Sequence, residues 1–274
     1  MAILLALCAA LFWGLADFMG GSLSRRHPLL AVLLVSQAVG MAGIVVVAFV
    51  RTANPSAAVV LPGIAAGLSG VTAALAFYRA MSVGSISVAA PILATGAVVP
   101  VVAGLATGER PSSLQMAGIV AALAGVVLAS REPDAGGGSV RGAGVLFALL
   151  AALMYGFQLI SLDHAARADA IWGVAFARMT AVVVLGSAAL LTRPVVSRGL
   201  VRPPVVIGVL DTTANAAFAL AATEGFLSIV SVLGSLFPVV TVALAHVHLH
   251  ERLARGQRLG VVLALAGTLA IAGG

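Results

Sequence analysis

The stretches AALFWGLADF, residues 9–18, and AALMYGFQLI, residues 151–160, lie inside long runs of Leu, Ala and Val about half the chain apart. Both begin with Ala-Ala-Leu, and both place an aromatic residue followed by glycine at the same position. That aromatic residue is Trp13 in the first stretch and Tyr155 in the second. An apolar pattern that occurs twice at this spacing indicates a duplicated, membrane-embedded unit.

The composition excludes an ordinary water-soluble domain. Hydrophobic residues make up 61% of the 274-residue chain and charged residues only 9%, whereas a soluble domain has about 25% charged residues. The mean hydropathy of +1.16 supports the same conclusion. The formal net charge of +6 comes from arginines scattered singly between apolar runs, which is typical of loop and interface anchors rather than of nucleic-acid binding.

Ten apolar segments are predicted to cross the membrane as helices, because each approaches the length of about 20 residues that a bilayer requires. These segments are 3–22, 29–50, 59–78, 84–106, 113–130, 143–161, 171–192, 204–223, 226–245 and 257–273. The chain is therefore predicted to consist of a first half, 1–132, a glycine-rich linker, 133–142, and a second half, 143–274.

The two halves match when they are offset by 142 residues. At this offset QMAGIVAALAG, residues 115–125, aligns with QRLGVVLALAG, residues 257–267, while the fourth span aligns better at 141. Because five spans per half is an odd number, the second half must enter the membrane from the opposite face. The predicted fold is an all-α integral membrane protein of ten transmembrane helices, built as two inverted five-helix repeats around a central cavity.

Polar residues inside the spans are the candidates for a binding site, because a charge at mid-membrane is costly and normally has a partner or faces water. Asp211 is the strongest candidate, and Asn215 follows it by one helical turn on the same face. Arg178, in the seventh span, could bind an anionic group or neutralise Asp211. At the offset of 142, the position that matches Arg178 holds Ser36, beside Gln37. The remaining candidates are Trp13, Asp17, Gln37, Tyr155 and Gln158. All of these candidates could instead have a structural role: Asp211 in helix packing or in a span that starts later, Arg178 by extending to the membrane interface, and the others in helix packing, at the interface or in an aromatic belt.

Helix-breaking residues occur in corresponding spans of the two halves. The fourth span contains Pro91, Gly96 and Pro100, and the ninth contains Gly234 and Pro238. Proline removes a backbone donor, and in a membrane the freed carbonyl is tolerated where protein or water can satisfy it. These positions are predicted to be hinges or helix breaks near the substrate site, although simple structural kinks are the alternative.

The order of these motifs resembles that of EamA-type proteins in the drug/metabolite transporter superfamily. The resemblance rests on the aromatic residue and glycine in the first span, on AFARMTAVVV at 175–184, and on SVLGSLFPVVTVALAHVHLHER at 231–252, which leads into the final Q…G…LALAG helix. It implies a solute transporter, often an exporter of amino acids or other metabolites, with two inverted halves around a central cavity.

The expected function is secondary transport of a small metabolite, an amino acid or a drug-like solute, by alternating access across the plasma membrane, with export as the expected direction. If transport is coupled to an ion, a proton is expected, with Asp211 or Asp17 as its carrier. A lipid or lipid-linked-sugar flippase and a non-transporting membrane scaffold remain the alternatives. The sequence shows no nucleophile, phosphate-loop or paired-carboxylate motif, so neither an enzyme nor a bound cofactor or metal is expected. The oligomeric state is left open.

Overall fold

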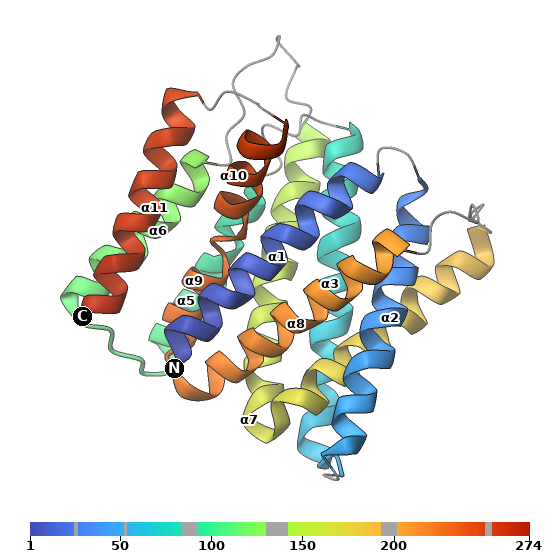
Figure 1. Cartoon of the computed structure of the whole chain (residues 1–274). Helices are drawn as coiled ribbons and strands as arrows, with labels where there is room; N and C mark the ends of the chain where they lie inside the picture. Colours follow the sequence, from blue (N-terminus) through green and yellow to red (C-terminus); the bar gives the residue numbers. More distant parts are fainter. Residues whose placement is uncertain (25–26, 52–53, 84–91, 130–141, 193–201, 250–253) are drawn as a thin grey trace.

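The computed structural model describes residues 1–24, 27–51, 54–83, 92–129, 142–192, 202–249 and 254–274, and within these ranges the chain is helical, without β-strands (Figure 1). The elements are α1 (Ala2–Ser24), α2 (Leu29–Val50), α3 (Ala57–Val83), η1 (Thr95–Ala97), α5 (Val98–Ala106), α6 (Ser113–Ala129), α7 (Gly142–Thr192), α8 (Arg202–Glu224), α9 (Leu227–Gly234), α10 (Phe237–Leu249) and α11 (Arg255–Gly273). The predicted linker, 133–142, lies almost entirely outside the described residues.

Six helices of the described chain are long and apolar enough to cross a membrane. Their apolar stretches are Ala2–Gly20, Leu29–Val50, Ala57–Phe77, Gly144–Thr192, Arg202–Glu224 and Arg255–Gly273. Three shorter apolar helical stretches accompany them, at Ile92–Ala106, Ser113–Ala129 and Leu227–Thr241. The protein is therefore an all-helical, multi-pass membrane protein.

Helix α7 contains two of the predicted spans, joined at a kink. At about 1.5 Å per residue, its 51 residues would be more than twice as long as the bilayer core is thick. Asp169 interrupts it with an extended backbone, φ −164° and ψ 115°. The Asp169 carboxylate accepts hydrogen bonds from the backbone N–H groups of Ile171 (2.9 Å) and Trp172 (3.0 Å), so it caps the second segment as a helix N-cap does. The kink lies within 162–170, the loop predicted between these spans.

Both segments that contain helix breakers are interrupted. Gly96 lies in the 3₁₀ turn η1, directly before α5, and Pro100 is the third residue of α5. Gly234 is the last residue of α9, and Pro238 is the second residue of α10. Pro91 lies outside the described residues. The breaks therefore occupy corresponding places in the two halves, while a hinge function for them remains a prediction.

Corresponding helices of the two halves run in opposite directions in Figure 1. Helix α1 runs away from the end of the molecule marked N, whereas the first segment of α7 runs towards that end. Helices α6 and α11, the last of each half, lie side by side and also run in opposite directions. The chain termini are at the same end of the molecule, as an even number of crossings requires.

Closely packed glycines show that the α6–α11 interface is symmetric. A Cβ atom on Gly125 would lie 2.7 Å from the Cα of Ala264, and a Cβ on Gly267 would lie 2.9 Å from the Cα of Ala122. Gly125 and Gly267 are 142 positions apart, as are Ala122 and Ala264. Each helix therefore makes the same contact with the other, and small residues allow this close approach, as in other membrane helix pairs.

A second pair of equivalent contacts joins the first span of each half to the broken span of the other half. A Cβ on Gly14 would lie 2.5 Å from the Cβ of Val240, and Gly156 packs equally closely on Val99. Gly14 and Gly156 are 142 positions apart, and Val99 and Val240 are 141 apart. The broken segments therefore pack directly against the aromatic-glycine stretches of the opposite half.

Candidate functional site

Arg178 on α7 forms an ion pair with Asp211 on α8. Its Nη1 lies 2.7 Å from the Asp211 Oδ2, and its Nη2 donates to the Asp211 backbone carbonyl at 3.1 Å. The same Nη1 also donates to the Gln37 Oε1, while the Gln37 Nε2 donates to the Asp211 Oδ2 at 3.3 Å. Because Gln37 is on α2, Arg178 on α7 and Asp211 on α8, this cluster joins the two halves of the chain.

Two further predicted residues extend this cluster along α8 and α7. The Asn215 Nδ2 donates to the Asp211 carbonyl at 2.7 Å and to the Asp211 Oδ1 at 3.2 Å. The Gln158 Nε2 in turn donates to the Asn215 Oδ1 at 3.5 Å, which is at the long limit for a hydrogen bond. Gln37, Arg178, Asp211, Asn215 and Gln158 therefore form one continuous network, called the polar network below.

The polar network is largely shielded from solvent. The Arg178 side chain is 8% exposed and that of Asp211 24%, and Asn215 is buried. A single charge at this depth would be costly, but two opposite charges at hydrogen-bonding distance neutralise each other. The pair accordingly supplies donors and acceptors without net charge. Within the described ranges, no three His, Cys, Asp or Glu side chains are placed to hold a metal ion.

The structure corrects the predicted register between the halves at Arg178. A Cβ on Gly67 would lie 2.5 Å from the Ala177 carbonyl oxygen, and Gly208, 141 positions later, packs in the same way on the carbonyl of Ser36. Ser36 is therefore equivalent to Ala177, and the position equivalent to Arg178 is occupied by Gln37 rather than Ser36. The sequence alignment is shifted by one residue here, because the first spans of the two halves match at an offset of 142 residues, whereas the second and third spans match at an offset of 141. Arg178 thus donates a hydrogen bond to Gln37, the residue at the equivalent position of the other half.

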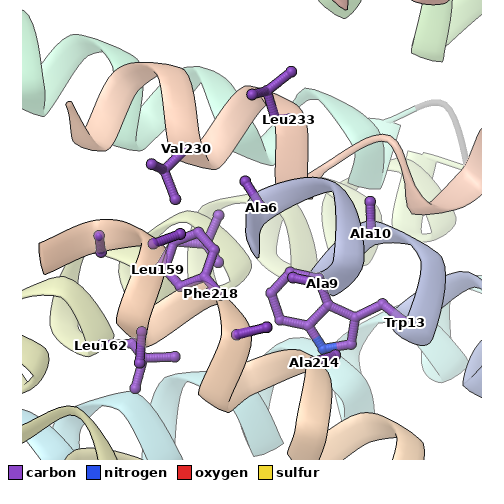
Figure 2. Close-up of a cluster of buried hydrophobic side chains, with 14 of the residues drawn as sticks. Ala6, Ala9, Ala10, Trp13, Leu159, Leu162, Ala214, Phe218, Val230 and Leu233 are labelled. Atoms are coloured by element: carbon purple, nitrogen blue, oxygen red, sulfur yellow. The ribbon is translucent and has the colours of Figure 1, made fainter. Parts of the chain in front are cut away.

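Aromatic side chains pack beside the polar network. The ring of Trp13 lies 6.5 Å from those of Tyr155 and Phe237 and 5.8 Å from that of Phe218, measured between centroids, and Tyr155 and Phe237 are 5.9 Å apart. Figure 2 shows Trp13 and Phe218 among small buried residues of α1 and α8 such as Ala9. We refer to Trp13, Tyr155, Phe218 and Phe237 as the aromatic cluster. The sequence predicted Trp13 and Tyr155 but not the two phenylalanines, which are indistinguishable in sequence from ordinary apolar span residues.

Asp17 follows Trp13 by one helical turn on α1 and therefore lies on the same helix face. The residue is exposed in the described structure, and the like charge of Asp211 acts on its carboxyl group. Tyr155 lies on the face of α7 that packs against Trp13, and its buried hydroxyl has no hydrogen-bond partner in the described part of the chain. All eight residues predicted for the site thus lie in, or next to, the polar network and the aromatic cluster.

Glu109 has a clear structural role that the sequence did not assign to it. Its Oε1 accepts from the Leu227 backbone N–H at 2.5 Å, and its Oε2 accepts from that of Ser228 at 3.0 Å. A carboxylate in this position satisfies two unpaired donors at the start of α9 and complements the helix dipole. Glu109 therefore ties the first half to the broken ninth segment. The signal was the repetition of Glu109-Arg110 at 251–252, and this second copy lies outside the described residues.

Comparisons with known proteins agree with these features. A family model described as the EamA-like transporter family matches residues 1–131 and again residues 142–273. A solved crystal structure, described only as that of a protein, superposes with a TM-score of 0.81 over 98% of this chain and 95% of its own, at 18% sequence identity. At this identity the likeness shows the fold alone. No curated protein matches the sequence.

Proposed function

This chain belongs to the EamA-like transporter family, and from this premise we propose that it is a secondary transporter of a small metabolite. The solute is an amino acid or a drug-like molecule, and the transport is export across the plasma membrane by alternating access. The observation that carries this proposal is the polar network, which joins α2, α7 and α8 deep within the helices. Hydrogen-bonding groups that are shared between two halves can be exposed to one side at a time when the halves rock.

The architecture that we propose for this function is ten spans arranged as two inverted five-helix repeats, 1–132 and 143–274, joined by the linker 133–142. The equivalent glycine contacts support it, because each half uses the same small residues against the other. The opposite directions of α1 and the first segment of α7 also support it (Figure 1). Two such halves meet at a surface that contains the polar network.

The substrate site in this proposal is formed by the aromatic cluster together with the polar network. Asp17, which is exposed and lies one helical turn after Trp13 on α1, is the point at which the solute enters this site in the proposal. If transport is coupled to protons, Asp17 or Asp211 carries the proton. The breaks at Gly96 and Gly234 serve as hinges, because a helix interrupted at this depth can change direction with little cost in backbone hydrogen bonds.

The test is solute transport in proteoliposomes that contain the purified protein. Solutes of several charge classes are first ranked by thermal shift, and the best are then measured by counterflow. We expect saturable counterflow that falls by about tenfold or more in Gln158→Ala, because the network loses a side chain at the substrate face. Glu224→Gln is the matched control, since this exposed side chain at the end of α8 is outside the site. Absence of flux for every solute class, with rapid exchange of a fluorescent lipid between leaflets, would refute solute transport and favour a flippase.

A further inference from the structure

The charge balance of the site is uneven. Arg178 and Asp211 neutralise each other at 2.7 Å. Asp17 has no such partner, because in the part of the chain that the structure describes it forms no hydrogen bond or ion pair. The charged group that acts on it is Asp211, which carries the same charge. Asp17 therefore offers the proposed site a carboxyl group that has no counter-charge from the described protein.

The groups around Asp17 can receive an organic cation. Trp13 lies one turn away on the same face of α1, and its ring meets that of Tyr155 edge-on at 6.5 Å, with an interplanar angle of 71°. Phe237 completes the group, 5.9 Å from Tyr155 and also edge-on. Rings arranged in this way present both faces and edges, and a cation within about 6 Å of a ring face is attracted to it. The buried Tyr155 hydroxyl, which has no partner in the described structure, can accept a hydrogen bond from an ammonium group.

The site offers much less to a carboxylate. The natural partner for one would be Arg178, but its two terminal nitrogens already donate to Gln37 and to Asp211. Three of the five guanidinium N–H donors serve these bonds, and the Nε–H is buried without a partner in the described structure. A substrate carboxylate at Arg178 would lie beside the Asp211 carboxylate, and like charges at short range disfavour this. Zwitterions and anions are therefore disfavoured relative to cations.

We propose that the transported solute is a monovalent organic cation, an amine with an aromatic or apolar body and no carboxylate, whose ammonium group pairs with Asp17 against Trp13 and Tyr155. The proposal rests on the transporter function proposed above and narrows its substrate class. Asp17 supplies the counter-charge, the aromatic cluster supplies the contact surface for the body, and the Arg178–Asp211 pair remains intact when the solute is bound.

The experiment compares four probes that share one phenyl body and differ in charge: phenethylamine, phenylalanine, 3-phenylpropionate and 2-phenylethanol. Binding to the purified protein is measured by calorimetry, and each probe is also tested for counterflow in proteoliposomes. We expect phenethylamine to bind at least about tenfold more tightly than the other three, because it alone brings an uncompensated positive charge. Asp17→Asn should remove this preference, Asp17→Glu should retain part of it, and Glu224→Gln should leave it unchanged.

The outcomes separate this inference from the transporter function. Tighter binding and counterflow of phenylalanine or 3-phenylpropionate would refute the cation proposal while supporting transport. Unchanged preference for phenethylamine in Asp17→Asn would refute the role of Asp17. The wild-type probe series decides the charge class even if Asp17→Asn does not fold. Phenethylamine binding without counterflow of any probe would contradict the transporter function instead.

Discussion

Removing both charges of the Arg178–Asp211 pair should destabilise the protein by much less than the sum of the two single removals. Asp211→Asn preserves the shape of the side chain but leaves the Arg178 guanidinium, only 8% exposed, without its counter-charge. Loss of one partner from a buried pair costs about 3–5 kcal/mol. Gln37 and the Asp211 carbonyl still accept from Arg178, so we expect the lower end, about 3 kcal/mol.

The double variant Arg178→Gln with Asp211→Asn leaves no unpaired charge. We therefore expect it to cost about as much as one single variant, about 3 kcal/mol, so that the coupling free energy is also about 3 kcal/mol. The measurement is reversible unfolding in mixed detergent micelles, followed by tryptophan fluorescence. Arg51 and Asp169 form a matched control pair at 3.3 Å, with the Arg51 side chain 48% exposed, and their coupling should stay below about 1 kcal/mol. Additive single effects at Arg178 and Asp211 would refute the view that the two charges neutralise each other in a shielded site.

Three further predictions concern the packing of α6 on α11, the Glu109 cap of α9 and the proton coupling of transport. Gly125→Ala should lower the free energy of unfolding by about 1–3 kcal/mol, because the new Cβ would overlap the backbone of α11. The control is Gly43→Ala, where a Cβ would have nothing within 4 Å, and it should change stability by less than about 0.5 kcal/mol. Equal effects of the two variants in the same unfolding assay would contradict the tight α6–α11 interface. Glu109→Gln should speed hydrogen exchange of the first backbone amides of α9 and lower the free energy of unfolding by about 1 kcal/mol, because the cap loses its charge. Unchanged hydrogen exchange would show that the cap is dispensable. If transport is proton-coupled through Asp211, flux in Asp211→Asn vesicles should no longer respond to a pH gradient, and an unchanged response would exclude Asp211 as the carrier.

The sequence singled out the residues of the polar network because charged and amide side chains are rare in apolar spans. Arg178, Asp211 and Asn215 could be found individually, since each is costly unless it has a partner. Their mutual arrangement could not be predicted, because it depends on which faces of α2, α7 and α8 meet. The paired breaks and the loop before the seventh span were likewise visible as proline, glycine and polar residues.

Other features left weaker signals in the sequence. Phe218 and Phe237 belong to the aromatic cluster, but a phenylalanine in an apolar helix carries no mark of its neighbours. The register at Gln37 was predicted one residue out, because a shift of one position between repeats is invisible in runs of Leu, Ala and Val. Glu109 was visible as a repeated motif, but its partners are backbone N–H groups, which no residue pattern identifies.

The proposed inverted repeat requires that the two halves are inserted in the membrane in opposite orientations, and the sidedness of labelling at equivalent positions can test this. Arg51, just after α2, and Thr192, the last residue of α7, are 141 positions apart, and both are exposed. Each is replaced singly by cysteine in a Cys8→Ser background, since Cys8 is the natural cysteine of the chain. A membrane-impermeant maleimide is then applied to intact cells and to inside-out vesicles. We predict that the two positions are labelled from opposite sides of the membrane; labelling of both from the same side would contradict the inverted arrangement.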